Sequence, residues 1–490
     1  MANLLDEASI LLTPTAYNNG SMLAVKPENG DGDFTFSRNS AATRVNAQGL
    51  VENVQILSSN LVSNGDFSQG GQDWTLGSNW SIGDDEVTHT GSGSYIEQGS
   101  LTQGSNYRVV INVTQASGSG FPQIYMGGLT TAMTSVGTYT FNIVAVANDK
   151  IKIRGLNDCK ISSVSVIEIT DDTNLPRIDY TDGCGSWLME GQSTNLVPYS
   201  SDFSNASWIK HTGIVLTSNQ ASPDGGNNAY KVQGTIGSSY ILDGGFGAIT
   251  PQSRSIYMRA DTNGVVYSLG DSQSNQINVT TEWQRFELQE VSNTIYAVDF
   301  RGSGVTLDTV YIWGAQLEQN SYATSYIPTS GATSTRLQDI ANNSGNASLI
   351  NSEEGVLYAK TKASVHNGDI TLSSGSNNDN LIIRFNLNSG RIDCNMKVAG
   401  AYQFIFNYTT DMSINNKIAV RYKANDFALF VNGTKVLTDI SGITPNANTF
   451  NELNFSSANQ ASNFFYGKTK ALAVFKTALT DAQLTLLTTI

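Results

Sequence analysis

Aromatic residues set among small polar residues are the first candidates for chemistry in this sequence. Trp80 and Tyr95 are each flanked by Ser, Gly or Asn. An aromatic ring can stack on the C–H face of a sugar, while nearby amides and hydroxyls bond the sugar hydroxyls. We therefore predict that Trp80 and Tyr95 are exposed and bind glycan. Four other tryptophans fall in repeated or strand-like patterns and are expected in a core: Trp74, Trp208, Trp283 and Trp313.

A second candidate is a turn with alternating oxygen ligands. Asn29, Asp31 and Asp33 alternate along NGDGD, as ligands do at the start of a calcium-binding loop. The Gly and the distal Glu of a complete EF-hand loop are missing, because Phe34 and Ser40 stand at those positions. An ordinary Gly-Asp turn is the competing interpretation. No cofactor is therefore expected, with calcium at this turn as the weaker alternative.

The sequence offers little for catalysis. Retaining glycosidases need two carboxyl groups about 5 Å apart, often from acidic residues that alternate on one strand. No Glu-x-Asp-x-x-Glu pattern and no Gly-x-Ser-x-Gly elbow occurs, and no His has another His or Cys at metal-ligand spacing. We predict that the protein is not an enzyme. A depolymerase whose carboxylates converge from distant strands stays open as an alternative.

Composition indicates which elements must position these residues. Hydrophobic residues make up 39% of the 490 residues and charged residues only 14%, with abundant Gly, Ser, Thr and Asn. This balance is too apolar for a disordered chain and suits short strands joined by polar turns. The net charge of −14 argues against nucleic acid as a partner, because phosphate binding needs clustered Lys and Arg.

Targeting signals and cysteine pairs are also missing from the sequence. The start, MANLLDEASILLTPTAYNNG, lacks the basic and apolar regions of a signal peptide, so we expect synthesis in a cytoplasm. No run approaches 18 apolar residues, so no membrane insertion is expected. Cys159, Cys184 and Cys394 are odd in number and far apart, which indicates unpaired thiols.

An internal repeat indicates two related domains. NLVSNGDFSQGGQDW (60–74) and NLVPYSSDFSNASW (195–208) share Asn-Leu-Val, then Asp-Phe-Ser, then a Trp. Alternating, strand-like segments follow each copy, which is typical of jelly-roll sandwiches. We expect an all-β chain of tandem β-sandwich or jelly-roll domains with one C-terminal helix. The predicted units are a docking or anchoring segment (1–55), a first jelly roll (56–170), a linker (171–194), a second jelly roll (195–341) and a different sandwich (351–490).

The last unit carries two local signals. Asn432-Gly433 predicts a two-residue hairpin turn, in which both positions need positive φ. Thr480 and Gln483 have the spacing of a capping box, which predicts a helix near the end of the sequence. Four residues share one face of that helix and are expected to pack on a sandwich: Leu479, Ala482, Leu486 and Ile490.

Three segments resemble parts of phage virion proteins, mostly tail-fibre or head-fibre appendage proteins. They are FTFSRNSAATRVNAQGLVENV (34–54), LPRIDYTDGCGSWLMEGQSTNLV (175–197) and GAQLEQNSYATSYIPTSGATSTRLQDIA (314–341). In such proteins the first two segments often run on directly, so 56–170 looks like an insertion. The repeated units resemble carbohydrate-binding-module or galactose-binding-like jelly rolls. Residues 351–490, with FALFVNG, resemble a laminin-G or concanavalin-like sandwich.

The resemblance implies a structural protein of a virion that adheres to host surface glycans. Its implied partners are other virion proteins, further copies of itself as in trimeric fibres, and a host glycan. A purely architectural head-decoration, neck or tail role is the first alternative, and the depolymerase is the second. The resemblance transfers no catalytic or sugar-binding residue to a particular position.

Overall fold

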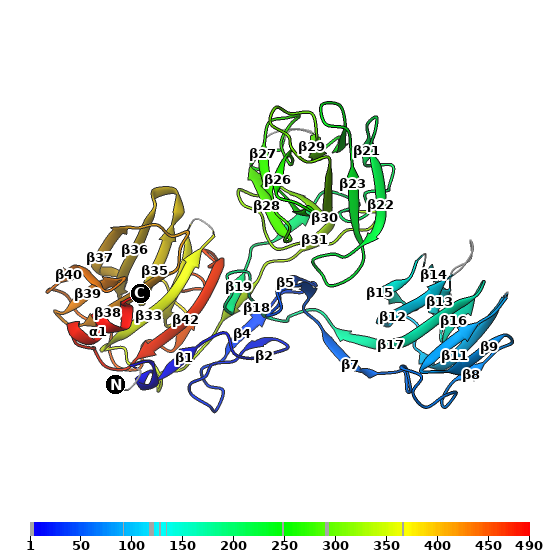
Figure 1. Cartoon of the computed structure of the whole chain (residues 1–490). Coiled ribbons are helices and arrows are strands. Elements are labelled where there is room, and N and C mark those ends of the chain that lie inside the picture. Colours follow the sequence, from blue (N-terminus) through cyan, green and yellow to red (C-terminus); the bar gives the residue numbers. More distant parts are fainter. Residues whose placement is uncertain are drawn as a thin grey trace.

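The described residues form three β-sandwiches (Figure 1). They meet at a junction made of three linking segments, residues 34–54, 175–197 and 314–341. The computed structural model describes residues 4–91, 93–116, 122–126, 129–133, 135–246, 249–289, 294–364 and 367–490. The predicted all-β fold is confirmed, including the C-terminal helix. Among these residues, no helix has the length and apolar character needed to cross a membrane.

The first sandwich spans the segment between β7 (Ile56–Asn60) and β17 (Cys159–Asp171). One sheet has the order β15 (Gly137–Val144), β12 (Asn106–Ala116), β17, β10 (Glu86–His89) and β9 (Trp80–Gly83), with β7 also on β17. The other has the order β14 (Leu129–Ala132), β13 (Gln123–Met126), β16 (Asp149–Gly155), β11 (Ser94–Leu101) and β8 (Thr75–Leu76). Buried residues alternate with partly exposed ones along β12, so one face of that strand enters the core.

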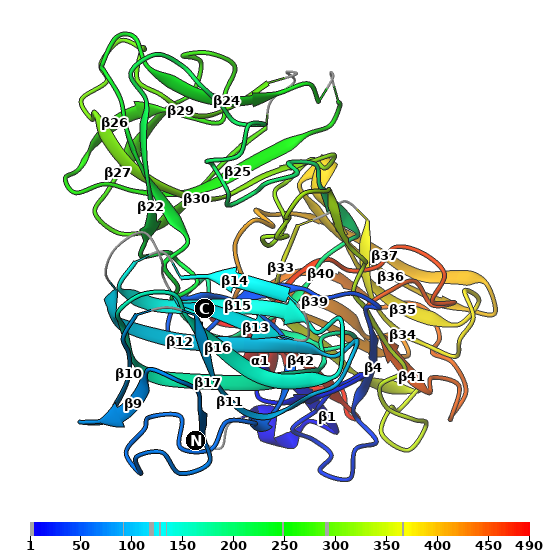
Figure 2. The same ribbon diagram turned by 90° about the vertical axis from the view of Figure 1, so that its right-hand side faces the viewer.

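The second sandwich has the same two-sheet plan and stands above the junction in both ribbon views (Figures 1 and 2). One sheet has the order β21 (Ile209–Lys210), β24 (Tyr240–Gly244), β29 (Thr294–Asp299), β26 (Gly264–Tyr267) and β27 (Gln276–Val279). The other has the order β22 (Val215–Gln220), β23 (Ala229–Gln233), β30 (Thr309–Glu318), β25 (Ser253–Arg259) and β28 (Gln284–Gln289).

The repeated motif builds the same local structure in both sandwiches. Phe67 packs on Trp74 with ring centroids 5.4 Å apart, and Phe203 packs on Trp208 at 4.8 Å. Each indole N–H donates to a backbone carbonyl, 3.0 Å from Trp74 and 2.8 Å from Trp208. All four rings belong to the cores. The repeat therefore specifies a core corner of each sandwich and not a binding surface.

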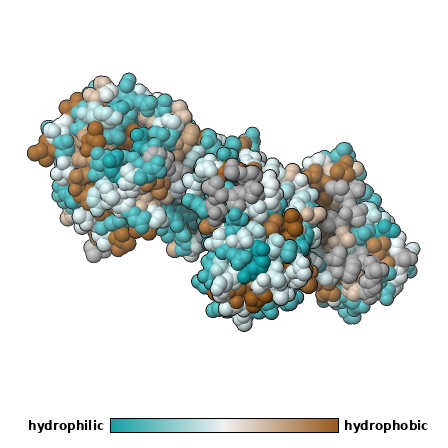
Figure 3. All heavy atoms as spheres, turned by 90° about the horizontal axis from the view of Figure 1, so that it is seen from above, coloured by the Kyte–Doolittle hydropathy of each residue, from teal (hydrophilic) through white to brown (hydrophobic). Residues whose placement is uncertain are grey.

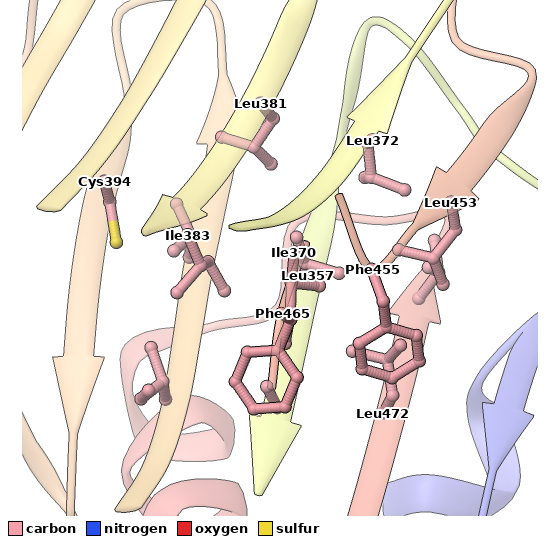
Figure 4. Close-up of a cluster of buried hydrophobic side chains, with 14 of the residues drawn as sticks. Leu357, Ile370, Leu372, Leu381, Ile383, Cys394, Leu453, Phe455, Phe465 and Leu472 are labelled. Atoms are coloured by element: carbon pink, nitrogen blue, oxygen red, sulfur yellow. The ribbon is translucent and has the colours of Figure 1, made fainter. Parts of the chain in front are cut away.

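The C-terminal sandwich takes strands from three distant parts of the chain. Its larger sheet has the order β18 (Arg177–Asp179), β19 (Ser186–Met189), β42 (Gly467–Phe475), β33 (Glu354–Ala363), β38 (Asn416–Lys423), β39 (Phe427–Val431) and β40 (Thr434–Asp439), with β1 (Ile10–Leu12) also on β42. The facing sheet has the order β37 (Ala401–Thr409), β36 (Arg391–Val398), β35 (Asn380–Asn386), β34 (Gly368–Ser373) and β41 (Glu452–Asn454). Figure 4 shows Leu357 and Leu472 of the larger sheet meeting Ile370 of the facing sheet in the core.

The two local signals of the last unit have different outcomes. Asn432 and Gly433 both take positive φ between β39 and β40, as the hairpin prediction required. Thr480 and Gln483 cap α1 (Asp481–Thr488) reciprocally. The buried face of this helix is not the predicted one, however, because Leu484 and Leu487 are buried while Leu486 is 55% exposed. Ala482 and Ile490 are exposed as well, and of the four predicted residues only Leu479, just before the helix, is buried.

The segments expected to dock and to link are integral parts of the structure. Residues 1–55 supply β1 and also β2 (Tyr17–Asn18), β3 (Ser21–Met22) and β4 (Phe34–Ser37), which pair in that order and end on β32 (Ile340–Asn342). The segment 171–194 supplies β18 and β19 to the C-terminal sandwich. Two short strand pairs lie in the same region. β5 (Thr43–Val45) and β6 (Val51–Asn53) form a hairpin, and β20 (Ser193–Asn195) pairs with β31 (Ser334–Arg336) across the base of the second sandwich.

A buried cluster of five charged residues, here called the ion cluster, lies in this junction: Arg38, Arg177, Glu190, Arg336 and Asp339. Asp339 accepts from Arg38 at 2.9 Å and from Arg177 at 2.5 Å. Glu190 accepts from Arg177 at 2.7 Å and also pairs with Arg336. The two acidic residues are joined as well, since the Glu190 amide donates to the Asp339 carboxylate at 2.8 Å.

The ion cluster has three guanidinium groups and two carboxylates, and each guanidinium group also donates to a backbone carbonyl. Arg38 donates to Leu175 O at 2.8 Å, Arg177 to Thr43 O at 3.1 Å and Arg336 to Gly191 O at 2.5 Å. The three linking segments of the junction thus meet through one hydrogen-bond network. Guanidinium groups suit this role because their donors project in a fixed fork.

Burial and charge pull the pKa values of the ion cluster in opposite directions. Burial by itself would raise the pKa of Glu190, but Arg336 and Arg177 bring it well below its ordinary value. The pKa of Asp339 is likewise lowered by Arg177 and Arg38 against the effect of burial. Burial lowers the pKa of Arg38 to about 10, against the attraction of Asp339. Glu190, Asp339 and Arg38 are therefore charged at neutral pH.

Removing one carboxylate of the ion cluster is expected to destabilise the junction strongly. Glu190→Gln leaves the buried Arg336 without its carboxylate and leaves Arg177 with Asp339 alone, and breaking a buried pair costs about 3–5 kcal/mol in other proteins. The exposed pair Lys150–Glu97 gives a matched control, because Glu97→Gln is expected to cost less than about 1 kcal/mol. Denaturant unfolding of both variants makes the comparison, and equal costs would contradict the role of the cluster.

Acidification is expected to act through the same carboxylates. Their pKa values are lower in the folded protein than in the unfolded chain, so they contribute stability above about pH 4 and lose it as the pH falls further. The Glu190→Gln variant lacks the Glu190 carboxylate, so acidification cannot remove the stability that this carboxylate contributes to the wild-type protein. The stability gap between wild type and this variant should therefore shrink between about pH 4 and pH 2. A gap independent of pH in unfolding experiments would exclude this linkage.

Candidate functional site

Trp80 lies inside the first sandwich and not on its surface. It is 7% exposed, sits on β9 opposite His89 of β10, and packs on the His89 ring at 4.6 Å. His89 is itself fully buried and bonds the Asn157 carbonyl at 3.0 Å. The polar residues around Trp80 belong to turns, while the ring itself turns inward. This position differs from the exposed one expected from the sequence.

Tyr95 lies on the outer face of the other sheet, beside a second tyrosine. Tyr95 of β11 and Tyr125 of β13 meet edge to face, with ring centroids 5.3 Å apart at 86°. The guanidinium carbon of Arg154 lies 5.9 Å from the Tyr95 centroid, and Arg154 pairs with Tyr95 in the β-ladder. We call Tyr95, Tyr125 and Arg154 the tyrosine face. All three side chains are partly exposed.

Strand alternation explains why these side chains share one face. Ile96, Ile124 and Ile153 are fully buried, so their neighbours along β11, β13 and β16 point away from the core. The hydrogen bond between the two tyrosines raises the pKa of Tyr95 above its ordinary value. The Tyr95 phenol therefore stays neutral at physiological pH. Two phenol hydroxyls, a guanidinium group and two aromatic rings are groups that bind sugar hydroxyls and C–H surfaces.

The two predicted glycan-binding residues do not form one site. Trp80 points into the core from one sheet, and Tyr95 points outward from the opposite sheet. Sequence reasoning did not identify Arg154 as part of the site, since it lies 59 positions after Tyr95. The available signal was the alternation of KIKIRG along β16, which places Lys152 and Arg154 on the face opposite the isoleucines.

The NGDGD turn is held by hydrogen bonds of its own. Asp31 N–H donates to Asn29 Oδ1 at 3.1 Å, and Asp33 Oδ1 accepts from Ala24 N–H at 2.8 Å. The Asp31 backbone carbonyl also accepts from Gly345 N–H at 2.9 Å, which ties the turn to the segment before the C-terminal sandwich. In the described ranges, no group of three or more His, Cys, Asp or Glu side chains is placed to hold a metal ion. A structural turn accounts for these contacts.

A cleft of about 360 Å³ separates the first and second sandwiches. Tyr139 and Phe141 of β15 stack at 5.9 Å on one wall. Tyr230 donates to Asp202 at 3.0 Å on the other wall, and Asn227 donates to the Thr138 carbonyl at 2.8 Å across the cleft. This combination of aromatic, amide and carboxylate groups could also contact a sugar. Aromatic side chains therefore lie in the cleft between the first two sandwiches as well as on an outer sheet face.

Comparison with known proteins assigns the last sandwich. Residues 356–485 match the family model of the concanavalin A-like lectin/glucanases superfamily. The C-terminal domain has this fold. The match confirms the concanavalin-like resemblance of the last unit. It covers about a quarter of the chain, and the two preceding sandwiches lie outside it. A search of curated protein sequences finds no match.

Several solved structures show similarity over part of the chain. One is the CBM40 of the Ruminococcus gnavus IT-sialidase bound to α2,3-sialyllactose, with 18% identity, 28% of this chain, 83% of that chain and a TM-score of 0.25. Another is domain 4 of an extracellular arabinanase from Geobacillus stearothermophilus in complex with arabinotriose, with 13% identity, 34% of this chain, 83% of that chain and a TM-score of 0.25.

Substituting the buried Trp80 is expected to affect stability. Trp80→Ala removes a large core ring and should cost about 3–5 kcal/mol, as large-to-small core changes do. Tyr95→Ala on the outer face should change the free energy of unfolding far less. Unfolding followed by tryptophan fluorescence distinguishes the two variants. A Trp80→Ala protein as stable as wild type would contradict the buried position.

Proposed function

We propose that the protein is a non-catalytic glycan-binding component of a bacteriophage particle, in a tail-fibre or head-fibre appendage. The observation that carries the glycan-binding role is the tyrosine face. It presents Tyr95, Tyr125 and Arg154 together on the outside of a five-stranded sheet. The contacts among the three side chains arrange them before a sugar binds, and such preorganisation lowers the entropic cost of binding.

The lectin-type fold of the last sandwich supports the same role. Its match to the concanavalin A-like superfamily adds a second domain type compatible with sugar recognition. Fold alone does not decide function, so the tyrosine face carries the proposal and the C-terminal sandwich supports it. Several weak sugar contacts on one particle would combine through multivalency.

The phage assignment is supported by the junction. The three segments that resemble phage virion proteins are the segments that meet in the ion cluster. A resemblance concentrated in a structural hub fits a common way of joining exchangeable sandwiches in a particle. Mass spectrometry of purified particles encoded by the genome that carries this sequence tests the assignment. The protein should be a stoichiometric component, and its absence from the particles would exclude the virion role.

A purely architectural role is the second candidate. The observation that favours it is a set of exposed isoleucines on the C-terminal sandwich, with Ile405 57%, Ile440 82% and Ile443 59% exposed. Gln403, two positions before Ile405 on β37, accepts a hydrogen bond from the Ile443 amide at 3.0 Å. The strand β37 and the loop after β40 therefore adjoin. Apolar residues gathered in this way can pack against another subunit. On the face seen in Figure 3, hydrophobic residues form separate small patches.

Glycan binding at the tyrosine face is tested on an array of bacterial surface polysaccharides. The wild-type protein should bind a subset of them saturably, and Tyr95→Ala and Tyr125→Ala should each weaken that binding by about tenfold, because each removes a ring from the platform. Tyr402→Ala is the matched control: it removes a tyrosine that is 55% exposed and lies 4.6 Å from Lys397 on another sandwich. Binding that is lost equally in the control, or never observed, would contradict the proposal.

A further inference from the structure

A sizeable cavity lies beneath the second sandwich. Its volume is about 600 Å³, and we call it the central cleft. One wall comes from β25 and β28, another from the junction, and a third from the edge of the C-terminal sandwich at Lys362 and Lys468. Its size is within the range of about 300–1,000 Å³ typical of small-ligand sites, which often lie between domains.

Aromatic side chains line two walls of the central cleft. Tyr257 and Trp283 come from the second sandwich, and Tyr180 and Tyr322 come from the junction. Trp313 packs against Tyr257 edge to face at 5.4 Å, so the position of Tyr257 is fixed from behind. Arg259 lies over Trp283 at 5.6 Å. Trp283 is only partly buried and lines the cavity, which differs from the core position expected from its strand-like pattern.

The charged groups of the central cleft cancel one another. Four basic and four acidic side chains line it, and each basic group already has a carboxylate partner. Lys362 pairs with Asp182 at 2.8 Å and Lys468 pairs with Asp179 at 2.8 Å. The other two pairs are Arg44–Glu52 at 2.9 Å and Arg285–Glu287 at 3.2 Å. An anionic ligand would have to compete with these carboxylates for its cations.

We propose that the central cleft is a second carbohydrate site, which takes an uncharged oligosaccharide. Trp283 and Tyr257 supply stacking faces, and the paired side chains offer hydrogen-bond donors and acceptors without a net charge. The walls come from three parts of the chain, so the site exists only when the junction is assembled. The inference deepens the proposed glycan-binding function, but it uses no residue of the tyrosine face.

The chain carries its own reporter for this site. Cys184 is exposed and follows Gly183, which lines the central cleft, whereas Cys159 and Cys394 are buried. Burial also raises the pKa of the Cys159 thiol to about 11, so this thiol reacts slowly. A maleimide fluorophore will therefore attach at Cys184, on the rim of the cleft.

The test titrates the labelled full-length protein with maltotriose, cellotriose, mannotriose and chitotriose, and with a galacturonate trimer as the charged comparison. At least one uncharged trimer should change the fluorescence saturably. Trp283→Ala should weaken that response by about tenfold, whereas Trp283→Tyr, which retains a ring, should largely preserve it. Tyr322→Ala on the opposite wall gives the same test if Trp283→Ala proves unstable.

The outcomes separate this site from the proposed function. A response retained by the Tyr95→Ala, Tyr125→Ala double variant and lost in Trp283→Ala supports the central cleft, whatever the array shows for the tyrosine face. No response to any uncharged trimer, a preference for the galacturonate trimer, or an equal response from Trp283→Ala would overturn the inference. Array binding that depends on Tyr95 would then still stand by itself.

Discussion

The structure depends on a buried set of ion pairs between three segments that are far apart in the sequence. Arg38, Arg177 and Arg336 share two buried carboxylates in the junction. Burying charge is expensive, and pairing only roughly offsets that cost, so the net stability from such a cluster is small. The cluster instead determines how the three segments dock on one another. Each guanidinium finds its carboxylate and its backbone carbonyl in one geometry, and any other docking of the segments leaves a charge unpaired.

One of the two candidate binding surfaces depends on the ion pairs of the junction, and the other does not. The tyrosine face needs only the first sandwich, because strand alternation and the β-ladder bring Tyr95, Tyr125 and Arg154 together. The central cleft needs the junction, because its walls come from the second sandwich, the linking segments and the C-terminal sandwich. One surface is thus local and the other is a product of domain docking. A chain built in this way can accommodate an inserted sandwich without losing the contacts of the ion cluster.

Much of the fold follows from local sequence rules. Asn432-Gly433 specified a hairpin because few other residue pairs accept positive φ at both positions, and Thr480 with Gln483 specified the start of a helix. The roles of the linking segments did not follow from such rules. Strands as short as β18 and β19 have no periodicity of their own, and β42, which pairs with β19, lies almost 300 residues later. Arg38 and Asp339 likewise look like ordinary surface residues until the fold brings them together.

The site shows the same division. Polar neighbours suggested an exposed Trp80, but its position on β9 turns the ring into the core, where it packs on His89. Tyr95 is on the surface, and Arg154 and Tyr125 join it through pairing between strands. Local composition indicates which residues could contact a sugar. The direction of each side chain depends on strand register, which the sequence specifies only through distant partners.

Hydrogen exchange of the junction amides is the most direct test of this account. The Glu190 amide donates to Asp339, the Asp339 amide donates to the Glu190 carbonyl, and the Ser325 amide donates to Glu190. If the ion cluster unites the three segments, these amides should exchange slowly and with a common opening free energy, and Glu190→Gln should accelerate all three together. Fast, independent exchange in the wild-type protein, like that of flexible linkers, would contradict the central claim.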